Sequence, residues 1–297
     1  MTYKIAWYYI PLLFIIFLII IIYVMYLKLK SIVYINATDL CLINIIPPIK
    51  AFSKITDYDH NNSKALCLLS LSTTKWTVCG KSFEKIPEID NFELVAAIKV
   101  YDTYTDSWIK NSIVYYSKDL NMLIISFSGT KSVEDWIVNL DYETAPASFY
   151  NNSKVKIKKS YLKMYESMRN NILRAITETI NDDTLVVCTG HSMGGCFSAI
   201  CYYDIIVNNL AKKRVLYSYG SPRVGNNEFA KILTDQLTTY RVTNTEDIVT
   251  AVPFSVMGDN IYCHYGQMIP FSINLESVIK NHVEAYFEFT QRANVIT

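Results

Sequence analysis

The stretch "VVCTGHSMGGCFSAI", from Val186 to Ile200, constrains the fold of this chain more than any other part of the sequence. A short apolar run ends at Gly190, a serine follows at position 192, and a second glycine stands at position 194. This is the pattern G-x-S-x-G, in which the chain turns sharply from a strand into a helix and side chains at the glycine positions would collide with neighbouring backbone. The turn lifts the Ser192 hydroxyl clear of the sheet. The pattern therefore predicts a nucleophile rather than a serine in an ordinary turn.

Apolar runs alternate with helical patterns along most of the chain, and this alternation predicts the fold class. Helical spacing of apolar residues is clear over 159–180, and a second helix is expected over 194–210, directly after the serine. Strand-like runs are found at 93–102, 111–117, 122–130, 184–190, 215–221 and 240–244. The strands are nearly continuous in apolar residues, as is typical of strands buried on both faces. We expect an α/β domain with a mostly parallel central sheet flanked by helices.

The amino-terminal region predicts a membrane anchor. Residues 5–27 contain no charged side chain, and these 23 residues would span about 35 Å as a helix, enough for a hydrocarbon core of roughly 30 Å. Aromatic residues stand near both ends of the run, and no convincing cleavage site follows it. We expect an anchor, or an uncleaved signal, over 1–30, a tether over 31–62, and the α/β domain over 63–297.

The charges that flank the apolar run do not decide on which side of the membrane the domain lies. Lys4 on one side of the apolar run is nearly balanced by Lys28 and Lys30 on the other. Glycosylation acceptor patterns and a possible Cys67–Cys79 disulfide favour a single-pass membrane protein with a luminal or extracellular body, or alternatively a secreted protein. The 28 basic and 27 acidic residues give no support to nucleic-acid binding.

A serine nucleophile needs a base, and the sequence contains four histidines. His60 precedes the expected domain, and His191 lies within the turn itself, where a packing or hydrogen-bonding role is expected. His264 and His282 remain, and both follow Ser192 in the chain order Ser, acid, His. Spacing alone does not choose between them.

The carboxylate that would orient the histidine is expected just beyond the strand 240–244. The polar loop that follows holds Glu246 and Asp247, and Asp259 stands slightly further on. Each of these three residues could instead be an ordinary carboxylate on the solvated surface. Their spacing favours Asp247 but leaves the other two open.

Several stretches together resemble the class 3, fungal-type triacylglycerol lipases. They occur in the order and approximate spacing of that family, and the resemblance extends from about Lys64 to the end of the chain. It implies the α/β-hydrolase fold. The stretches are "ALCLLSLSTTKWTVCG", "ISFSGTKSVEDWIVNL", "VVCTGHSMGGCFSA", "YGSPRVGNNEFA", "YRVTNTEDIVTAVP", "YCHYG" and "KNHVEAYF".

Position by position, the resemblance implies that Ser192 is the nucleophile, Asp247 the acid and His282 the base. His264 then matches the separate histidine of the family's Y-x-H-x-G segment, which supports the site without being the base. The resemblance also implies an oxyanion hole made by Thr130 and the backbone amide of Met193.

Two positions depart from the family pattern. Ser128 stands where the family usually has Arg before the Gly-Thr pair, and Met268 stands where it has Glu after Y-x-H-x-G. Neither position belongs to the implied triad. The departures bear on loop anchoring and substrate preference more than on hydrolysis.

An amphipathic stripe follows Thr130 directly. Its members, at helical spacing, are Val133, Trp136, Ile137 and Leu140. A packed surface helix is the ordinary interpretation of such a stripe. Its position beside the expected oxyanion hole, and its resemblance to the lipase lid, predict instead a lid that opens at a lipid surface.

The sequence therefore predicts a serine-dependent carboxylic ester hydrolase acting on lipid esters at a membrane or lipid interface, with triacylglycerol as the implied substrate. A phospholipase A1 or another lipid esterase is the alternative, and a catalytically silent lipid-binding protein is the alternative from a different class. No Cys/His cluster has the spacing of a metal site, so neither metal nor organic cofactor is expected. The cysteines around the turn, Cys188, Cys196 and Cys201, are expected to be packing residues.

Overall fold

A computed structural model describes residues 46–78, 86–103, 105–130 and 142–292 of the chain. These residues all belong to one compact unit, Ala37–Thr297. The expected anchor and the expected lid lie outside the described residues. Within the described part of the chain, none of the helices combines the length and the apolar character needed to cross a membrane.

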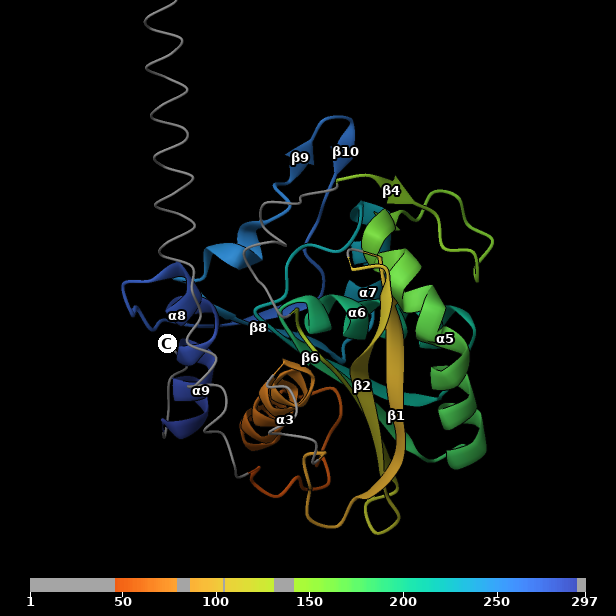
Figure 1. Ribbon diagram of the computed structural model, residues 1–297. Coiled ribbons are helices and arrows are strands. Elements are labelled where there is room, and N and C mark those ends of the chain that lie inside the picture. Colours follow the sequence, from red (N-terminus) through yellow and green to blue (C-terminus); the bar gives the residue numbers. More distant parts are fainter. Residues whose placement is uncertain (1–45, 79–85, 104, 131–141, 293–297) are drawn as a thin grey trace, which may run out of the picture. The chain divides into compact units, whose positions relative to one another are not determined.

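A seven-stranded sheet forms the centre of the described unit (Figure 1). Its order is β1, β2, β3, β6, β7, β8, β11. The five strands from β3 onward are parallel to one another, and β2 pairs antiparallel with both β1 and β3. The strand bounds are Glu93–Asp102, Ser107–Ser117, Met122–Phe127, Leu185–His191, Lys213–Tyr219, Thr239–Asn244 and Gln267–Phe271. The mostly parallel sheet predicted from the sequence is thus confirmed.

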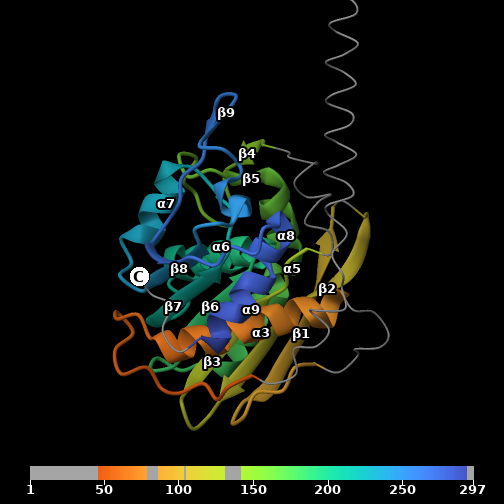
Figure 2. The same cartoon turned by 90° about the vertical axis from the view of Figure 1, so that its left-hand side faces the viewer.

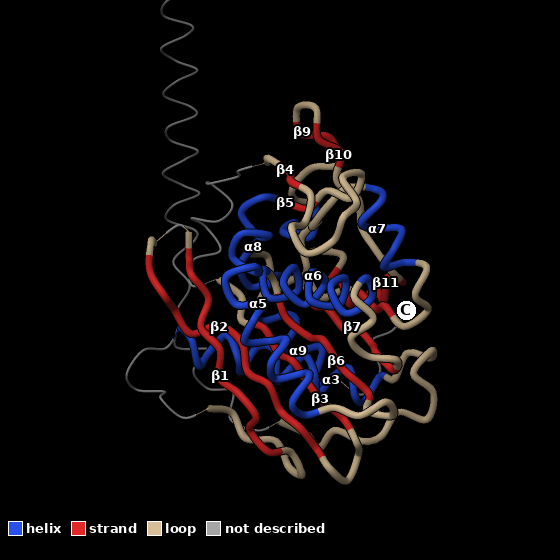
Figure 3. The backbone as a smooth tube through the Cα atoms, turned by 90° about the vertical axis from the view of Figure 1, so that its right-hand side faces the viewer, coloured by secondary structure: helices blue, strands red, loops and turns tan. Residues whose placement is uncertain are grey.

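Helices cover both faces of this sheet. Figure 2 shows α3 (His60–Val78) and α9 (Glu284–Gln291) on one face, and Figure 3 shows α5 (Lys159–Thr179) and α6 (Met193–Val207) on the other. Because side chains of a strand alternate between its faces, Thr189 of β6 is hydrogen-bonded to Ser70 of α3 at 3.0 Å, whereas Cys188 approaches Cys201 of α6. The remaining elements are β4 (Thr144–Ala145), β5 (Ile157–Lys158), α7 (Asn227–Thr234), η2 (Ile248–Ala251), β9 (Val256–Met257), β10 (Asn260–Ile261) and α8 (Val278–His282).

The helix α3 has no marked amphipathic pattern because it is enclosed almost all round. It packs between the sheet and α9, and buried hydroxyls alternate along it with buried Leu and Ala side chains. These hydroxyls are satisfied within the protein. Ser70 and Thr73, for example, each donate to the carbonyl four residues earlier and also contact a hydroxyl of the sheet.

The described segment before α3, residues 46–59, packs against the rest of the domain. Ile49 is buried in the core beside α3, Lys50 and Asn62 exchange hydrogen bonds, and the Asp59 amide donates to the Tyr217 hydroxyl at 3.0 Å. These contacts fall within the stretch 31–62 that the sequence predicts as a tether.

The possible disulfide of Cys67 is not formed. Cys67 has a free, buried thiol that donates to the Tyr286 carbonyl at 3.7 Å, and Cys79 lies outside the described residues. Burial also raises the pKa of the Cys196 thiol to about 12 and that of Cys201 well above its usual range, while Cys188 is buried beside Cys201. The prediction that the three cysteines around the turn are packing residues is confirmed by this burial.

Candidate active site

Ser192 sits at the apex of a strained turn between β6 and α6. Its backbone has φ 58° and ψ −128°, which is costly for a residue with a side chain. The Ser192 amide donates to the Tyr219 carbonyl at 2.9 Å and ties the turn to β7. A Cβ at Gly190 would lie 2.2 Å from the Gly194 carbonyl oxygen, and one at Gly194 would lie 2.3 Å from that of Phe127. Both glycines are therefore needed for the bend, as the sequence pattern predicts.

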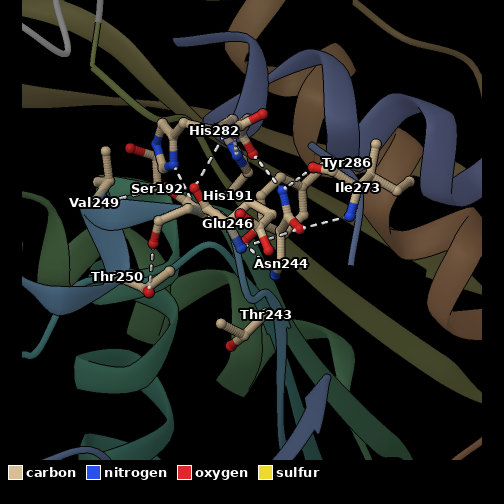
Figure 4. Close-up of polar contacts among 12 residues, drawn as sticks. His191, Ser192, Thr243, Asn244, Glu246, Val249, Thr250, Ile273, His282 and Tyr286 are labelled. Carbon is tan, nitrogen blue, oxygen red and sulfur yellow. Dashed lines mark hydrogen bonds and ion pairs between the residues drawn. The ribbon is translucent and has the colours of Figure 1, made fainter. Parts of the chain in front are cut away.

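Asp247 and His282 meet at the carboxyl end of the sheet. Asp247 lies just after β8 and caps the N-terminus of η2, and His282 ends α8. His282 Nδ1 is 2.8 Å from Asp247 Oδ2, and both side chains are buried (Figure 4). The carboxylate accepts this bond, so Nδ1 carries the proton and Nε2 of the neutral ring holds the lone pair. This is the arrangement required of a general base.

Ser192 and His282 lie in the same small cluster, as Figure 4 shows. Ser192 Oγ and His282 Nε2 are both buried, and neither has a hydrogen-bond partner among the described residues. The structure thus brings the three predicted residues together, with the Asp–His bond made and the Ser–His bond unmade. Catalytic hydrogen bonds of this kind often tighten only when substrate is present.

The Asp247 carboxylate is further held by two donors. The Val249 amide donates to Oδ1 at 3.0 Å, and the Tyr286 hydroxyl donates to Oδ2 at 2.9 Å. Burial and the nearby carboxylate raise the pKa of Tyr286 well above its usual range, so the phenol remains a donor. Gly220, with φ 54°, leaves room here, because a Cβ would lie 3.1 Å from Asp247 Oδ2 and 3.0 Å from the Tyr286 hydroxyl. The sequence showed an aromatic after His282 but not this role.

His191 supports the same cluster from the turn itself. Its Nε2 donates to the backbone carbonyl of His282 at 2.6 Å, and the two rings are 4.7 Å apart. Burial, together with the neighbouring His282, holds the pKa of His191 well below its usual range. His191 therefore stays neutral, and it orients His282 without adding a positive charge to the cluster.

His264 occupies a different environment. Burial and the guanidinium groups of Arg241 and Arg223 lower its pKa to about 3. A histidine that resists protonation this strongly is a poor general base. The geometry favours His282, which contacts a carboxylate, over His264, which faces two cations.

Neither of the other acid candidates contacts a histidine in the described part of the chain. The Glu246 side chain is exposed and accepts from Ser272 at 3.4 Å, while Asp259 lies at the exposed tip of the β9–β10 hairpin. Of the three candidates, Asp247 alone has the partner that the chemistry needs.

The loop after β3 lies beside Ser192. A methyl group at Gly129 would be 3.5 Å from Ser192 Cβ, and Thr130 follows directly. On the other side, Met193 begins α6, so the positive end of the helix faces the same region. These are the positions that an oxyanion hole would occupy. The predicted lid residues Val133, Trp136, Ile137 and Leu140 lie outside the described residues.

Ser128, the first departure from the family pattern, ties this loop to α3. Its hydroxyl is 2.6 Å from Thr77 Oγ1 and donates to the Gly129 carbonyl at 2.8 Å, and the Gly129 amide donates to Thr74 Oγ1 at 2.9 Å. Hydroxyls of α3 thus anchor the loop where the family usually has an arginine.

Met268, the second departure, is the register partner of Arg241 between β11 and β8. The buried Arg241 donates to the Tyr265 carbonyl and the Thr243 hydroxyl, which are both neutral acceptors. A glutamate at position 268 would stand beside this guanidinium. With Met268 in its place, Arg241 lacks a carboxylate at this position of the sheet, and the candidate triad is not affected.

Two asparagines that the sequence did not indicate position the histidine loop. Asn244, the last residue of β8, donates to the carbonyls of Ile273 and Asn281 at 2.9 and 3.0 Å. Asn281, beside His282, donates to the Glu246 carbonyl at 3.2 Å. The two side chains therefore lock the loop that carries His282 onto the loop that carries Asp247. An amide residue at a strand end and another next to a histidine are too common to be recognised in advance.

Comparison with known proteins finds similarity to lipases in sequence and in fold. The family model described as Lipase (class 3) matches residues 124–257. A lipase of Rhizomucor miehei is 28% identical over 174 residues, which cover 57% of this chain and 45% of the relative. A phospholipase A1-II 5 of Oryza sativa subsp. indica is 33% identical over 116 residues, covering 35% of this chain and 24% of the relative.

Solved structures extend the likeness to the fold. A triacylglycerol lipase whose catalytic centre is formed by a serine protease triad superposes with a TM-score of 0.58 at 21% identity, covering 73% of this chain and 82% of that one. The chain spans about half of the length of the curated lipases it matches. The class 3 lipase model thus matches residues 124–257, and over about three quarters of its length this chain is similar in fold to solved lipases.

Proposed function

We propose that this protein hydrolyses carboxylic esters of lipids, with Ser192 as nucleophile, His282 as general base and Asp247 as the orienting acid. The observation that carries the proposal is the buried Asp247–His282 bond beside a strained serine whose hydroxyl has no hydrogen-bond partner among the described residues. A strained backbone and unpaired buried polar atoms are costly, and such features persist chiefly at functional sites.

The chemistry follows from the positions of these groups. Ser192 Oγ attacks the ester carbonyl while His282 Nε2 takes its proton, and the proton then passes to the leaving alcohol. Asp247 stabilises the imidazolium through Nδ1. The Met193 amide and Thr130 would receive the negative charge of the tetrahedral oxygen, and water attacking the acyl-serine would release the fatty acid.

Triacylglycerol is the substrate we propose first, because the relatives include fungal lipases that are described as acting on mono- and diacylglycerols and a structure described as a triacylglycerol lipase. Phospholipase A1 activity is the alternative, supported by similarity to plant phospholipases A1. Both reactions use the same machinery on an acyl ester. A panel of glycerides and phospholipids assayed under one condition distinguishes them.

Covalent labelling tests the proposed machinery directly. A fluorophosphonate probe should modify Ser192 in the full-length protein, and Ser192→Ala should abolish the label. His282→Ala should slow labelling by at least about a thousandfold, because the serine loses its base. Tyr202→Phe removes a buried hydroxyl that contacts Thr238 and should label like the wild type. An unlabelled wild type would leave the catalytically silent lipid-binding protein as the better description.

We further propose the roles of the two regions outside the described residues. Residues 133–140 would form a lid whose apolar stripe covers the site in water and turns to the lipid at an interface. Residues 1–30 would anchor the protein in a membrane, with the hydrolase domain on the luminal or extracellular side. The absence of charge over residues 5–27 supports the anchor, and the fungal relatives described as secreted support an exported domain.

A further inference from the structure

A buried arginine of the central sheet has no carboxylate partner in the described part of the chain. Arg241 of β8 is only 6% exposed, and its guanidinium donates to two neutral oxygens, the Tyr265 carbonyl at 3.4 Å and the Thr243 hydroxyl at 3.2 Å. The first of these distances is long for an N–H···O bond. Because an arginine keeps its proton in a protein, a buried guanidinium is costly unless negative charge lies close to it.

A second arginine adds to this excess of positive charge. Arg223, in the loop between β7 and α7, also donates to neutral acceptors, the carbonyls of Ala251 and of Pro253, the latter at 2.9 Å. Burial, together with the charge of Arg223, lowers the pKa of Arg241, and burial also lowers the pKa of Arg223. The fold therefore disfavours both charges, and among the described residues no carboxylate offsets them.

His264 completes this group without adding a charge. Burial and the same two arginines hold its pKa at about 3, and its Nδ1 is buried with no hydrogen-bond partner in the described ranges. We name Arg223, Arg241 and His264 the basic cluster. Its members come from the loop after β7, from β8 and from the loop before β11, so the fold itself brings them together.

Position 268 shows where negative charge would belong. Met268 of β11 is the register partner of Arg241 in the parallel pair, so the two side chains lie on the same face of the sheet, on strands about 4.8 Å apart. Met268 is 42% exposed, and solvent therefore reaches the edge of the basic cluster here. A glutamate, which the family pattern has at this position, would face the guanidinium from within the chain.

We propose that the basic cluster binds a small inorganic oxyanion of the phosphate type, in place of the carboxylate that Met268 does not provide. The planar fork of a guanidinium matches the paired oxygens of such an anion. The anion offsets the charge of Arg241 and Arg223. Because Arg223 also holds the carbonyls of Ala251 and Pro253, the anion stabilises the segment that follows η2. The burial of Arg241 favours a free ion over the phosphate of a lipid head group.

Stability measured against phosphate concentration tests the site in the full chain. The protein is kept at pH 7 in a non-ionic detergent, and inorganic phosphate replaces sodium chloride at constant ionic strength. The ratio of folded to unfolded protein should rise along a saturable curve, about tenfold at ten times the Kd. Urea denaturation measures the ratio, and calorimetry measures the Kd. A wild type that gains nothing when phosphate replaces chloride overturns the proposal.

Met268→Glu supplies the missing carboxylate from within the chain. Without phosphate this variant should be more stable than the wild type, and phosphate should raise its folded ratio less than about twofold, because Arg241 already has an anionic partner. Met268→Gln is the matched control of similar size without charge, and it should keep the wild-type response. Equal responses of all three proteins would indicate a general salt effect and overturn the site.

Two further measurements cover the remaining outcomes, and none of them depends on hydrolysis. If Met268→Glu does not fold, Arg223→Gln takes its place and should weaken phosphate binding at least about tenfold, since a charged donor is lost. An unchanged Kd would contradict the site. Glycerophosphocholine carries the phosphate of a lipid head group as a diester and should not stabilise the wild type. Stabilisation equal to that by inorganic phosphate would identify head groups as the ligand and overturn the choice of a free ion.

Discussion

At the scale of single residues, Thr74 of the buried helix α3 contacts the loop that carries Gly129 beside Ser192. Its hydroxyl donates to the Ser70 carbonyl at 3.1 Å and accepts from the Gly129 amide at 2.9 Å. Thr130, one residue further, is the position that would complete the oxyanion hole. Thr74 is therefore a positioning residue in our proposal: it fixes the loop through Gly129 and does not touch substrate.

Replacing Thr74 by Val keeps its shape and removes the acceptor. We expect kcat to fall about tenfold with little change in KM, because the loop would then place its donors less well against the transition state, where misplacement is most costly. Steady-state kinetics on a dissolved short-chain ester measure this split, and Thr74→Ser should restore the rate.

Thr73→Val is the matched control for Thr74→Val. Thr73 lies on the same helix with an equally buried hydroxyl, which contacts Ser126 at 2.8 Å and not the loop. It should lower stability by a comparable amount and leave kcat near the wild-type value. If both variants lose kcat equally, the effect belongs to helix packing and the positioning role is wrong.

At the scale of elements, a buried ion pair joins the two helices that cover one face of the sheet. Arg169 of α5 contacts Asp204 of α6 through two bonds of 2.7 and 3.1 Å, and Asp204 is fully buried. Tyr165 and Asn208 donate to the same carboxylate at 2.8 and 2.6 Å. The carboxylate thus has four bonds from three side chains, and α6 is the helix that begins at Met193.

Arg169→Met should lower the free energy of unfolding by about 3 kcal/mol, because it leaves a buried carboxylate without its cation. Urea denaturation of the full chain in detergent measures this loss. Lys231→Met breaks an exposed pair with Asp235 and should cost less than about 1 kcal/mol. A loss at Arg169 as small as that at Lys231 would show that Tyr165 and Asn208 suffice for the carboxylate.

The elements that could be predicted from the sequence are those with a strong periodic pattern. The helix expected over 159–180 is found at Lys159–Thr179, and the strand expected over 93–102 has the same bounds in the structure. The helix α3 was not predicted, because it is enclosed on all sides and its buried hydroxyls hide the apolar stripe. The same holds for the candidate site: only the part with a local sequence pattern could be predicted. The bend at Ser192 has such a pattern. The bond from Tyr286 to Asp247, and the bond from Asn244 to the carbonyl beside His282, join residues far apart in the chain and have no such pattern.

At the scale of the whole molecule, buried neutral histidines make stability depend on pH. His264 has a pKa lowered to about 3 by burial and by Arg241 and Arg223, against about 6.5 in an unfolded chain. Between these values the unfolded state binds a proton that the folded state does not. The contribution of His264 is therefore fully present above pH 6.5 and is lost progressively as the pH falls toward 3.

We expect the wild type to lose about 1–2 kcal/mol more than His264→Asn between pH 7 and pH 5, since the variant has no ring to titrate. The free energy of unfolding, measured in urea at both pH values for both proteins in the same detergent, gives this difference. His191 is present in both proteins, and its lowered pKa acts in the same direction, so the variant should retain part of the slope. Parallel curves for the two proteins would mean that His264 is protonated as readily in the folded chain as in the unfolded one. The argument that Arg241 and Arg223 keep this histidine neutral, and with it unfit to be the base, would then be wrong.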